Sequence, residues 1–183
     1  MNMKKFLSLL LLSIFSLGCF AQAETKEKTV KFDFTDGSTL NPAIEIPEGR
    51  SSIDVIDYVF TAGPISLSFT TNKLYPAYKE YNGEKKLYMY GSNSIIIKSD
   101  NEHDIIKFRF SDGTIIGGFG LPRENAVGTF SSSGEWVNID KEGNEIDGIK
   151  QLVLYNSQSD SKITGIEVTY RSPLDVLAEP TCT

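Results

Sequence analysis

The sequence predicts an all-β protein: a two-layer antiparallel β-sandwich, jelly-roll-like, with about nine to eleven short strands. Three observations support this prediction. Apolar residues alternate with polar ones in many short segments, which is the period of a strand with one buried face. Turn residues separate these segments at intervals of about 8–12 residues. No segment after residue 23 repeats its apolar residues with the period of a helix.

The first strand is expected over 29–35. Its apolar side chains, Val30, Phe32 and Phe34, fall on one face, and polar side chains fall on the other. Asp36-Gly37 then ends the segment with residues that favour a turn. This is the pattern of a strand that packs one face against a core and exposes the other.

Two more strands are expected after an irregular connection that contains prolines. The first covers 53–60 and places Ile56, Tyr58 and Phe60 on one face. The second covers 65–70, where alternation of apolar and polar residues is among the most regular in the chain. The long connection between the early strands is typical of Greek-key folds.

The centre of the sequence predicts three strands in succession. Residues 87–90 form the first, and Ile95-Ile96-Ile97 forms the second, an apolar run suited to a strand buried on both faces. The third strand follows and ends at the turn residues Asp112-Gly113. The inward side chains of that third strand are expected to be Ile106, Phe108 and Phe110.

The last third of the sequence carries weaker signals. Glycines weaken segment 114–120, which is therefore expected to be a bulged edge strand or a loop. Trp136, on a short strand, is expected in the core. Strands are also predicted over 149–155 and 163–170, with a bulge beside Gly165. The last strand's inward side chains are expected to be Ile166, Val168 and Tyr170.

Several of these segments together resemble a known domain. The motifs are VKFDFTDGSTLNP near the start, LYMYGSNSIIIKS and HDIIKFRFS in the middle, and GEWVN and KITGIEVTY near the end. With them the chain resembles a β-sandwich, jelly-roll-like domain that recurs in exported proteins of Bacteroidetes. The resemblance implies the fold, since the motifs are mostly core and turn positions. It implies no activity, because that family is largely without assigned function, and it supplies no catalytic or binding residue.

Residues 1–23 are predicted to be a signal peptide. Two lysines precede an apolar run over 6–20, and Ala21-Gln22-Ala23 supplies the small residues at a cleavage site. The run is shorter than the roughly 20 residues of a spanning helix, so no transmembrane span is expected in the mature chain. An alternative is a lipid anchor at Cys19. In either case the protein is expected to be exported, and to be periplasmic, secreted or at the cell surface.

The remaining chain divides into a charged leader over 24–28, one β-sandwich domain over 29–171 and a C-terminal tail over 172–183 that includes Cys182. Removal of the signal peptide takes away two lysines and no acid, so the net charge changes from −6 to −8. An acidic chain without a basic cluster cannot bind phosphates by counterion release, and nucleic acid is therefore excluded as an expected partner.

The sequence does not predict an enzyme. Its single histidine, His103, lies in a polar turn where no nucleophile accompanies it, and it is expected to be solvated. Zinc sites need several histidine or cysteine ligands, and with one histidine and two cysteines in the chain no zinc site is expected. Glycoside hydrolysis needs only two acids, but the chain has 24 of them and no pair is distinguished.

A structural calcium ion is the one cofactor that the sequence suggests. Asp140, Glu142 and Asn144 offer alternating oxygen ligands in an acidic loop. The spacing does not follow the EF-hand rule, because Glu145 stands where that loop needs a glycine. A solvated acidic turn is the other interpretation.

The most suggestive candidate for ligand binding is the polar segment 71–85, expected to be a loop. It contains Tyr75, Tyr78 and Tyr81, and Tyr88 and Tyr90 follow closely. Aromatic rings with a polar edge can stack on sugar rings or anchor a protein interface. The other interpretation is that these rings cap one end of the sandwich.

The sequence therefore predicts an exported, non-catalytic binding module, with a glycan as the first-guess ligand. The alternative is a structural or protein-interaction subunit of the cell envelope, such as an adhesin component or an inhibitor, whose partner is an extracellular protein.

Overall fold

The computed structural model describes residues 27–171, except residues 72, 117, 125, 158 and 159. The predicted signal peptide with Cys19, residues 24–26 of the leader and the tail with Cys182 lie outside the described residues. The described residues all belong to one unit of the chain, Lys26–Pro173.

This part of the chain is all-β, as predicted. It contains fourteen strands, so the expected nine to eleven were too few, and the pairs between strands are antiparallel. Within the described residues the helical content is a single 3₁₀ turn, Gly37–Thr39. No helix in that part is long and apolar enough to cross a bilayer.

The strands form three sheets. The first sheet has the order β1 (Glu27–Asp33), β14 (Gly165–Arg171), β8 (Asp104–Phe110), β11 (Glu135–Val137) and β10 (Thr129–Phe130). The second has the order β3 (Phe60–Ala62), β4 (Ile65–Thr71), β7 (Asn93–Ser99), β12 (Gln151–Asn156) and β9 (Phe119–Gly120). The third, smaller sheet has the order β13 (Ser161–Ile163), β6 (Glu84–Met89), β5 (Ala77–Tyr81) and β2 (Ser52–Asp54).

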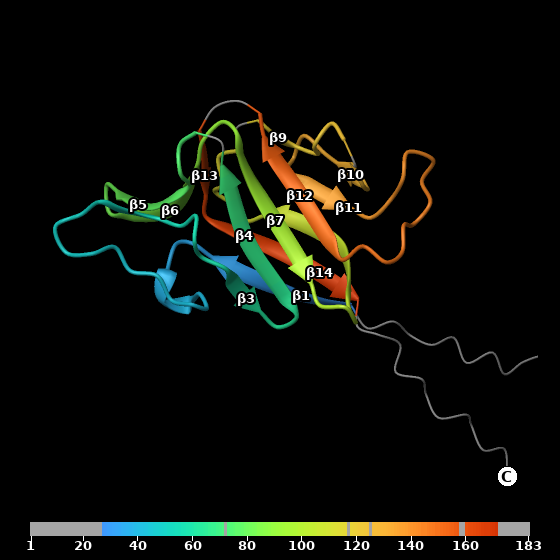
Figure 1. The fold of residues 1–183 in the computed structure, drawn as a ribbon, viewed down its shortest axis with the longest axis horizontal. Helices are drawn as coiled ribbons and strands as arrows, with labels where there is room; N and C mark the ends of the chain where they lie inside the picture. Colours follow the sequence, from blue (N-terminus) through green and yellow to red (C-terminus); the bar gives the residue numbers. More distant parts are fainter. Residues whose placement is uncertain (1–26, 72, 117, 125, 158–159, 172–183) are drawn as a thin grey trace, which may run out of the picture. The chain divides into compact units, whose positions relative to one another are not determined.

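The first and second sheets form the sandwich, and the core lies between them. In Figure 1, β4, β7 and β12 cross over β1 and β14, while the hairpin of β5 and β6 lies at the left-hand end. Alternate side chains of both sheets are buried in one cluster, which includes Phe32, Phe108, Val168, Leu67, Ile97 and Leu154. The third sheet closes this end of the core with inward side chains from β5, β6 and β13, which are Tyr78, Leu87, Met89 and Ile163.

Trp136 lies in the core, as expected. Its side chain has no exposed surface, and its indole N–H donates a hydrogen bond of 2.7 Å to the carbonyl oxygen of Val127. A buried indole needs such an acceptor.

The strand expected over 53–60 is wrong, because the chain turns in its middle. Only β2 and β3 are strands, and they belong to different sheets. The N–H of Tyr58 bonds to the carbonyl oxygen of Val55, which closes a turn, and Ile56 lies in that turn. The period-two pattern of this segment therefore belongs to a turn, and its apolar side chains Ile56 and Tyr58 pack against the core while partly exposed.

Residues 71–85 do not form a loop as expected; most of them belong to a β-hairpin. Strands β5 and β6 pair from Ala77 opposite Tyr88 to Tyr81 opposite Glu84. The two residues between them, Asn82 and Gly83, have φ angles of 53° and 78°. Two positive φ angles define the tight turn whose twist matches that of the two strands, and Asn-Gly is its preferred sequence.

The strand expected over 163–170 divides between two sheets. Ile163 of β13 pairs with Leu87 in the third sheet, whereas Gly165 of β14 pairs with Asp33 in the first. A Cβ atom on Gly165 would lie 2.7 Å from the hydroxyl of Ser111, so glycine permits the close packing where the chain changes sheets. The expected bulge beside Gly165 is therefore a sheet crossover.

A register shift occurs instead between β14 and β8. Thr169 pairs with Lys107 and Tyr170 pairs with Ile105, which leaves Ile106 without an opposite residue. Ile105 therefore takes the core position. Ile106, expected to point inward, belongs to the opposite face and lines a surface concavity there, because an unpaired residue reverses the alternation of faces.

Candidate functional site

The three tyrosines singled out by the sequence do not lie on one surface. Tyr75 and Tyr81 are 54% and 65% exposed, whereas Tyr78 is 1% exposed and points into the core. The Tyr78 hydroxyl accepts a hydrogen bond of 2.9 Å from the N–H of Gly37, which is also buried. Burial raises the pKa of Tyr78 above its usual value. Tyr78, predicted among the ligand-binding residues, is therefore placed in the packing of the domain, with its ring in the core and its hydroxyl bonded to Gly37.

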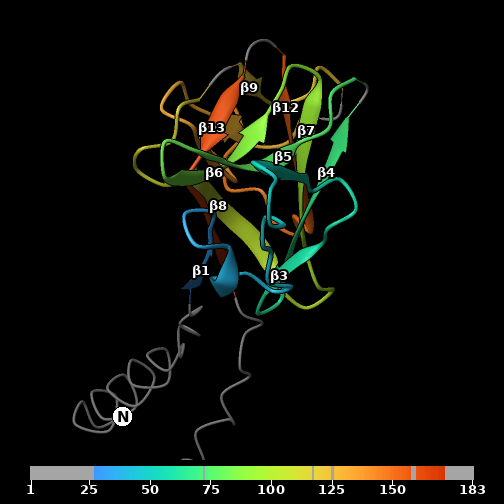
Figure 2. The same cartoon turned by 90° about the vertical axis from the view of Figure 1, so that its left-hand side faces the viewer.

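The outer face of the third sheet carries a different group of aromatic side chains. Tyr88 of β6 lies opposite Ala77 on one side and Lys162 of β13 on the other. Directly paired residues share a face, so these three side chains lie on the side of the sheet that faces away from Leu87. Figure 2 shows β13, β6 and β5 across the front of the domain.

Two lysines reach over the tyrosine rings of this face. The ammonium nitrogen of Lys79 lies 5.3 Å from the centroid of the Tyr88 ring and 5.1 Å from that of Tyr90. The ammonium nitrogen of Lys162 lies 5.5 Å from the Tyr88 centroid. Lys86 is the third lysine of the group, because it lies directly opposite Lys79 in the pairing of β5 with β6. We call Lys79, Lys86, Tyr88, Tyr90 and Lys162 the tyrosine–lysine face.

The tyrosines of this face stand out in the sequence, but its lysines do not. The position of two of these lysines was partly predictable. Asn82-Gly83, flanked by AYKEY and EKKLYM, is a strong indication of a β-hairpin. A two-residue turn at that point fixes the register and places Lys79 opposite Lys86. Nothing local indicates Lys162, which reaches Tyr88 only because β13 pairs with β6.

Charges on this face are balanced differently from those on the first sheet. On the outer face of the first sheet, lysine and arginine side chains pair with acids: Lys31 with Asp33 at 2.9 Å, Lys107 with Glu135 at 2.8 Å and Arg109 with Glu167 at 2.6 Å. On the tyrosine–lysine face, Lys86 pairs with Glu84 at 2.7 Å. Among the described residues, neither Lys79 nor Lys162 has a carboxylate within ion-pair distance.

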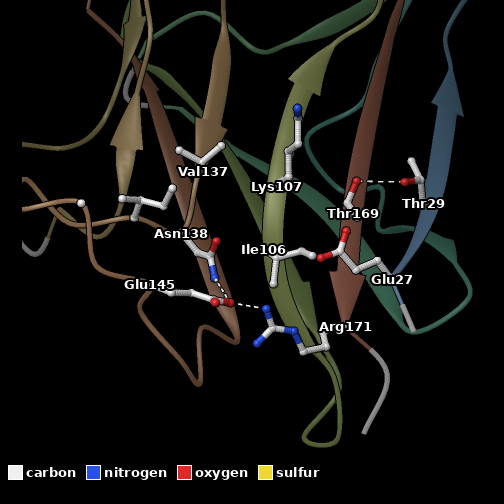
Figure 3. A pocket seen from close by; sticks show the side chains of 11 residues that line it. Glu27, Thr29, Ile106, Lys107, Val137, Asn138, Glu145, Thr169 and Arg171 are labelled. Atoms are coloured by element: carbon white, nitrogen blue, oxygen red, sulfur yellow. Dashed lines mark hydrogen bonds and ion pairs between the residues drawn. The ribbon is translucent and has the colours of Figure 1, made fainter. Parts of the chain in front are cut away.

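A concavity of about 570 Å³ lies on the outer face of the first sheet (Figure 3). Ile106, displaced by the register shift, is part of its lining, and polar side chains surround it. Arg171 and Glu145 face each other across it and form an ion pair. The hydrogen bond from Arg171 lowers the pKa of Glu145.

Other polar groups of this concavity also bond to one another. The amide of Asn138 donates to Glu145 at 3.2 Å, and the hydroxyls of Thr29 and Thr169 share a hydrogen bond of 2.9 Å. Lys107, on the lining, already pairs with Glu135. A ligand would have to compete with these internal partners, so the concavity is a weaker candidate than the tyrosine–lysine face.

The acidic loop is closed by its own hydrogen bonds. One oxygen of the Asp140 carboxylate accepts from the N–H groups of Glu142 and Asn144 at 2.9 and 2.8 Å, and the other accepts from the Asn144 amide at 3.1 Å. The backbone N–H of Asn144 is the main cause of a lowered pKa at Asp140. No group of three histidine, cysteine or acidic side chains within the described residues is arranged to hold a metal. The shape of the loop is thus explained without the suggested calcium ion.

His103 is less solvated than expected. Its Nδ1 atom lies 2.7 Å from a carboxylate oxygen of Asp100, and its ring packs edge-on against Tyr170, with centroids 5.2 Å apart. The hydrogen bond with His103 lowers the pKa of Asp100. Both contacts are explained as closure of the turn before β8.

No protein-family model, curated protein or solved structure matches the chain.

Proposed function

We propose that this protein is an exported, non-catalytic binding module of the Bacteroidetes domain type that its motifs resemble, and that it binds a glycan on the tyrosine–lysine face. The observation that carries the proposal is the arrangement of Tyr88 and Tyr90, which lie partly exposed beneath the ammonium group of Lys79. Tyrosine rings offer an apolar surface for the C–H groups of a sugar, and the lysines offer hydrogen-bond donors for its oxygens.

The surroundings of the face support a binding role. Ala77, directly beside Tyr88, has a side chain too small to cover the ring. The exposed Tyr75 lies two residues before β5, and the exposed Tyr81 ends that strand, so further aromatic surface is available at both ends of the hairpin. A chain-like ligand could therefore make contacts along β5 and β6.

The test is a comparison of two tyrosine variants on a panel of immobilised glycans. Tyr88→Ala removes the central ring, and Tyr155→Ala removes another partly buried tyrosine from the outer face of the second sheet. We expect the wild type and Tyr155→Ala to bind the same glycans and Tyr88→Ala to lose them. Equal binding by all three proteins, or binding by none of them, contradicts the proposal.

The alternative function is a structural or protein-interaction subunit of the envelope. The observation that favours it is β1, a seven-residue strand at the edge of the first sheet that pairs, within the described residues, with β14 alone. An open edge can accept a strand from another protein. Lys28 and Lys31 in β1 oppose this, since charged side chains protect an edge from such pairing.

A further inference from the structure

We propose that the ligand of the tyrosine–lysine face is an anionic polysaccharide in which a uronic acid packs against the exposed part of Tyr88 and its carboxylate is bound by Lys79 and Lys162. This inference rests on the proposed function and goes further, because it assigns the charge of the ligand. Positive charge gathers on this face although the net charge of the chain is −6.

The face holds like charges together without sufficient acids to neutralise them. Lys79 lies directly opposite Lys86, and like charges in directly paired positions destabilise a sheet. Glu84 neutralises Lys86. Elsewhere on this sheet the same hairpin pairs opposite charges, since Glu80 lies opposite Lys85 on the other face. The unbalanced positive charge is thus confined to the outer face.

Lys79 and Lys162 converge on one ring from the strands on either side of it. Their ammonium nitrogens lie 5.3 and 5.5 Å from the Tyr88 centroid, so the two nitrogens are at most 10.8 Å apart. The contact with the ring offsets part of their repulsion. Among the described residues, neither lysine has a carboxylate within ion-pair distance. A bound anion between them would therefore supply the missing ion-pair partner.

The same geometry indicates where the acid group is attached to the ligand. A uronic acid carries its carboxylate directly on the sugar ring, so a sugar packed against Tyr88 holds that group beside the tyrosine ring that both ammonium nitrogens flank. A sulfate ester places its charge one oxygen further from the sugar ring. Lysine binds either group as a point charge. Because both ammonium nitrogens lie within 5.5 Å of the Tyr88 centroid, the shorter attachment of the carboxylate is favoured.

An acid at one edge of the face limits where a polyanion can extend. Asp54 of β2 lies beside Ala77 and on the same face as Tyr88, at the edge away from Lys162. The favoured path for an anionic chain therefore runs along β6 and β13. The overall negative charge of the protein also opposes a polyphosphate such as nucleic acid, whose charge density is higher.

The experiment measures binding to polygalacturonate, dextran sulfate and neutral dextran by affinity electrophoresis at about 20 mM and about 200 mM NaCl. The test variant is Lys79→Gln/Lys162→Gln. The control is Lys98→Gln/Lys141→Gln, which makes the same charge change at two exposed lysines on the second sheet and in the acidic loop. Melting curves followed by Trp136 fluorescence confirm that each variant is folded.

We expect the wild type and the control to bind polygalacturonate best, with weaker binding at the higher salt concentration. We expect the test variant to lose about tenfold in affinity or more and most of its salt dependence. Equal losses in both variants would mean nonspecific charge attraction and would overturn the inference. Stronger binding to dextran sulfate than to polygalacturonate would overturn the assignment of a carboxylate.

Failure of this inference is distinguishable from failure of the proposed function. Binding of neutral glycans that depends on Tyr88 but not on Lys79 and Lys162 would leave the proposed function standing and refute the anionic ligand. Absence of binding to every glycan, neutral or charged, would refute both.

Discussion

Replacing Tyr78 by phenylalanine should destabilise the domain without affecting ligand binding. The substitution keeps the buried ring and removes only the hydroxyl that accepts the N–H of Gly37 at 2.9 Å. The backbone N–H of this buried glycine would lose its acceptor, which costs about 1–3 kcal/mol. With a urea m-value of about 2 kcal/mol/M, the midpoint of unfolding should fall by about 0.5–1.5 M.

The measurement is urea unfolding at pH 7 followed by the fluorescence of Trp136, the only tryptophan, which is fully buried in the folded state. Tyr81→Phe is the matched control: it removes a hydroxyl from a ring that is 65% exposed, and its unfolding midpoint should stay within experimental error. An unchanged midpoint for Tyr78→Phe would refute the reasoning. A loss of glycan binding by Tyr78→Phe at unchanged stability would show that Tyr78 contacts the ligand after all.

Three further predictions concern the turns and loops. Gly37→Ala should cost about 1–3 kcal/mol in urea unfolding, because its Cβ would lie 2.3 Å from the carbonyl oxygen of Ile44; a variant as stable as the wild type contradicts this packing. The hydrogen bond from Arg171 lowers the pKa of Glu145 in the folded state, so its contribution is present above the unfolded pKa and is lost as the pH falls through the folded pKa. Melting temperatures measured from pH 6 down to pH 3 should therefore fall less steeply for Glu145→Gln than for the wild type, and parallel curves would argue against the pair. Calcium or a chelator should leave the melting temperature unchanged, since the carboxylate of Asp140 is already bonded within its loop, and a calcium-dependent rise would show that the loop binds the ion.

The interior faces of long strands could be predicted well from the sequence. Phe108 and Val168 are in the core as their alternation indicated, and the isolated Trp136 is buried among them. Burial of one face of a sheet requires this alternation, so the sequence pattern and the structure agree wherever pairing is regular. The pattern was misleading where a tertiary feature interrupts it, as at Ile106, which lost its inward position to a register shift against β14.

Part of the candidate site was also open to prediction. Tyr88 and Tyr90 stood out as aromatic residues in a polar region, and the turn at Asn82-Gly83 could have indicated the hairpin. Which rings face solvent could not be predicted, because that depends on which side of the hairpin rests on the core. The buried hydroxyl of Tyr78 also needs a hydrogen-bond partner, and that partner, Gly37, comes from a turn that is distant in the sequence.

The sequence by itself determined that the chain is all-β and which residues form most of its core, since period-two alternation is a local property of the chain. Only the tertiary structure decided that Lys162 joins Lys79 over the ring of Tyr88. Those residues meet because β13 pairs with one edge of the hairpin while β14, just after it, joins another sheet. Such pairing is selected by the packing of the whole core rather than by any local pattern.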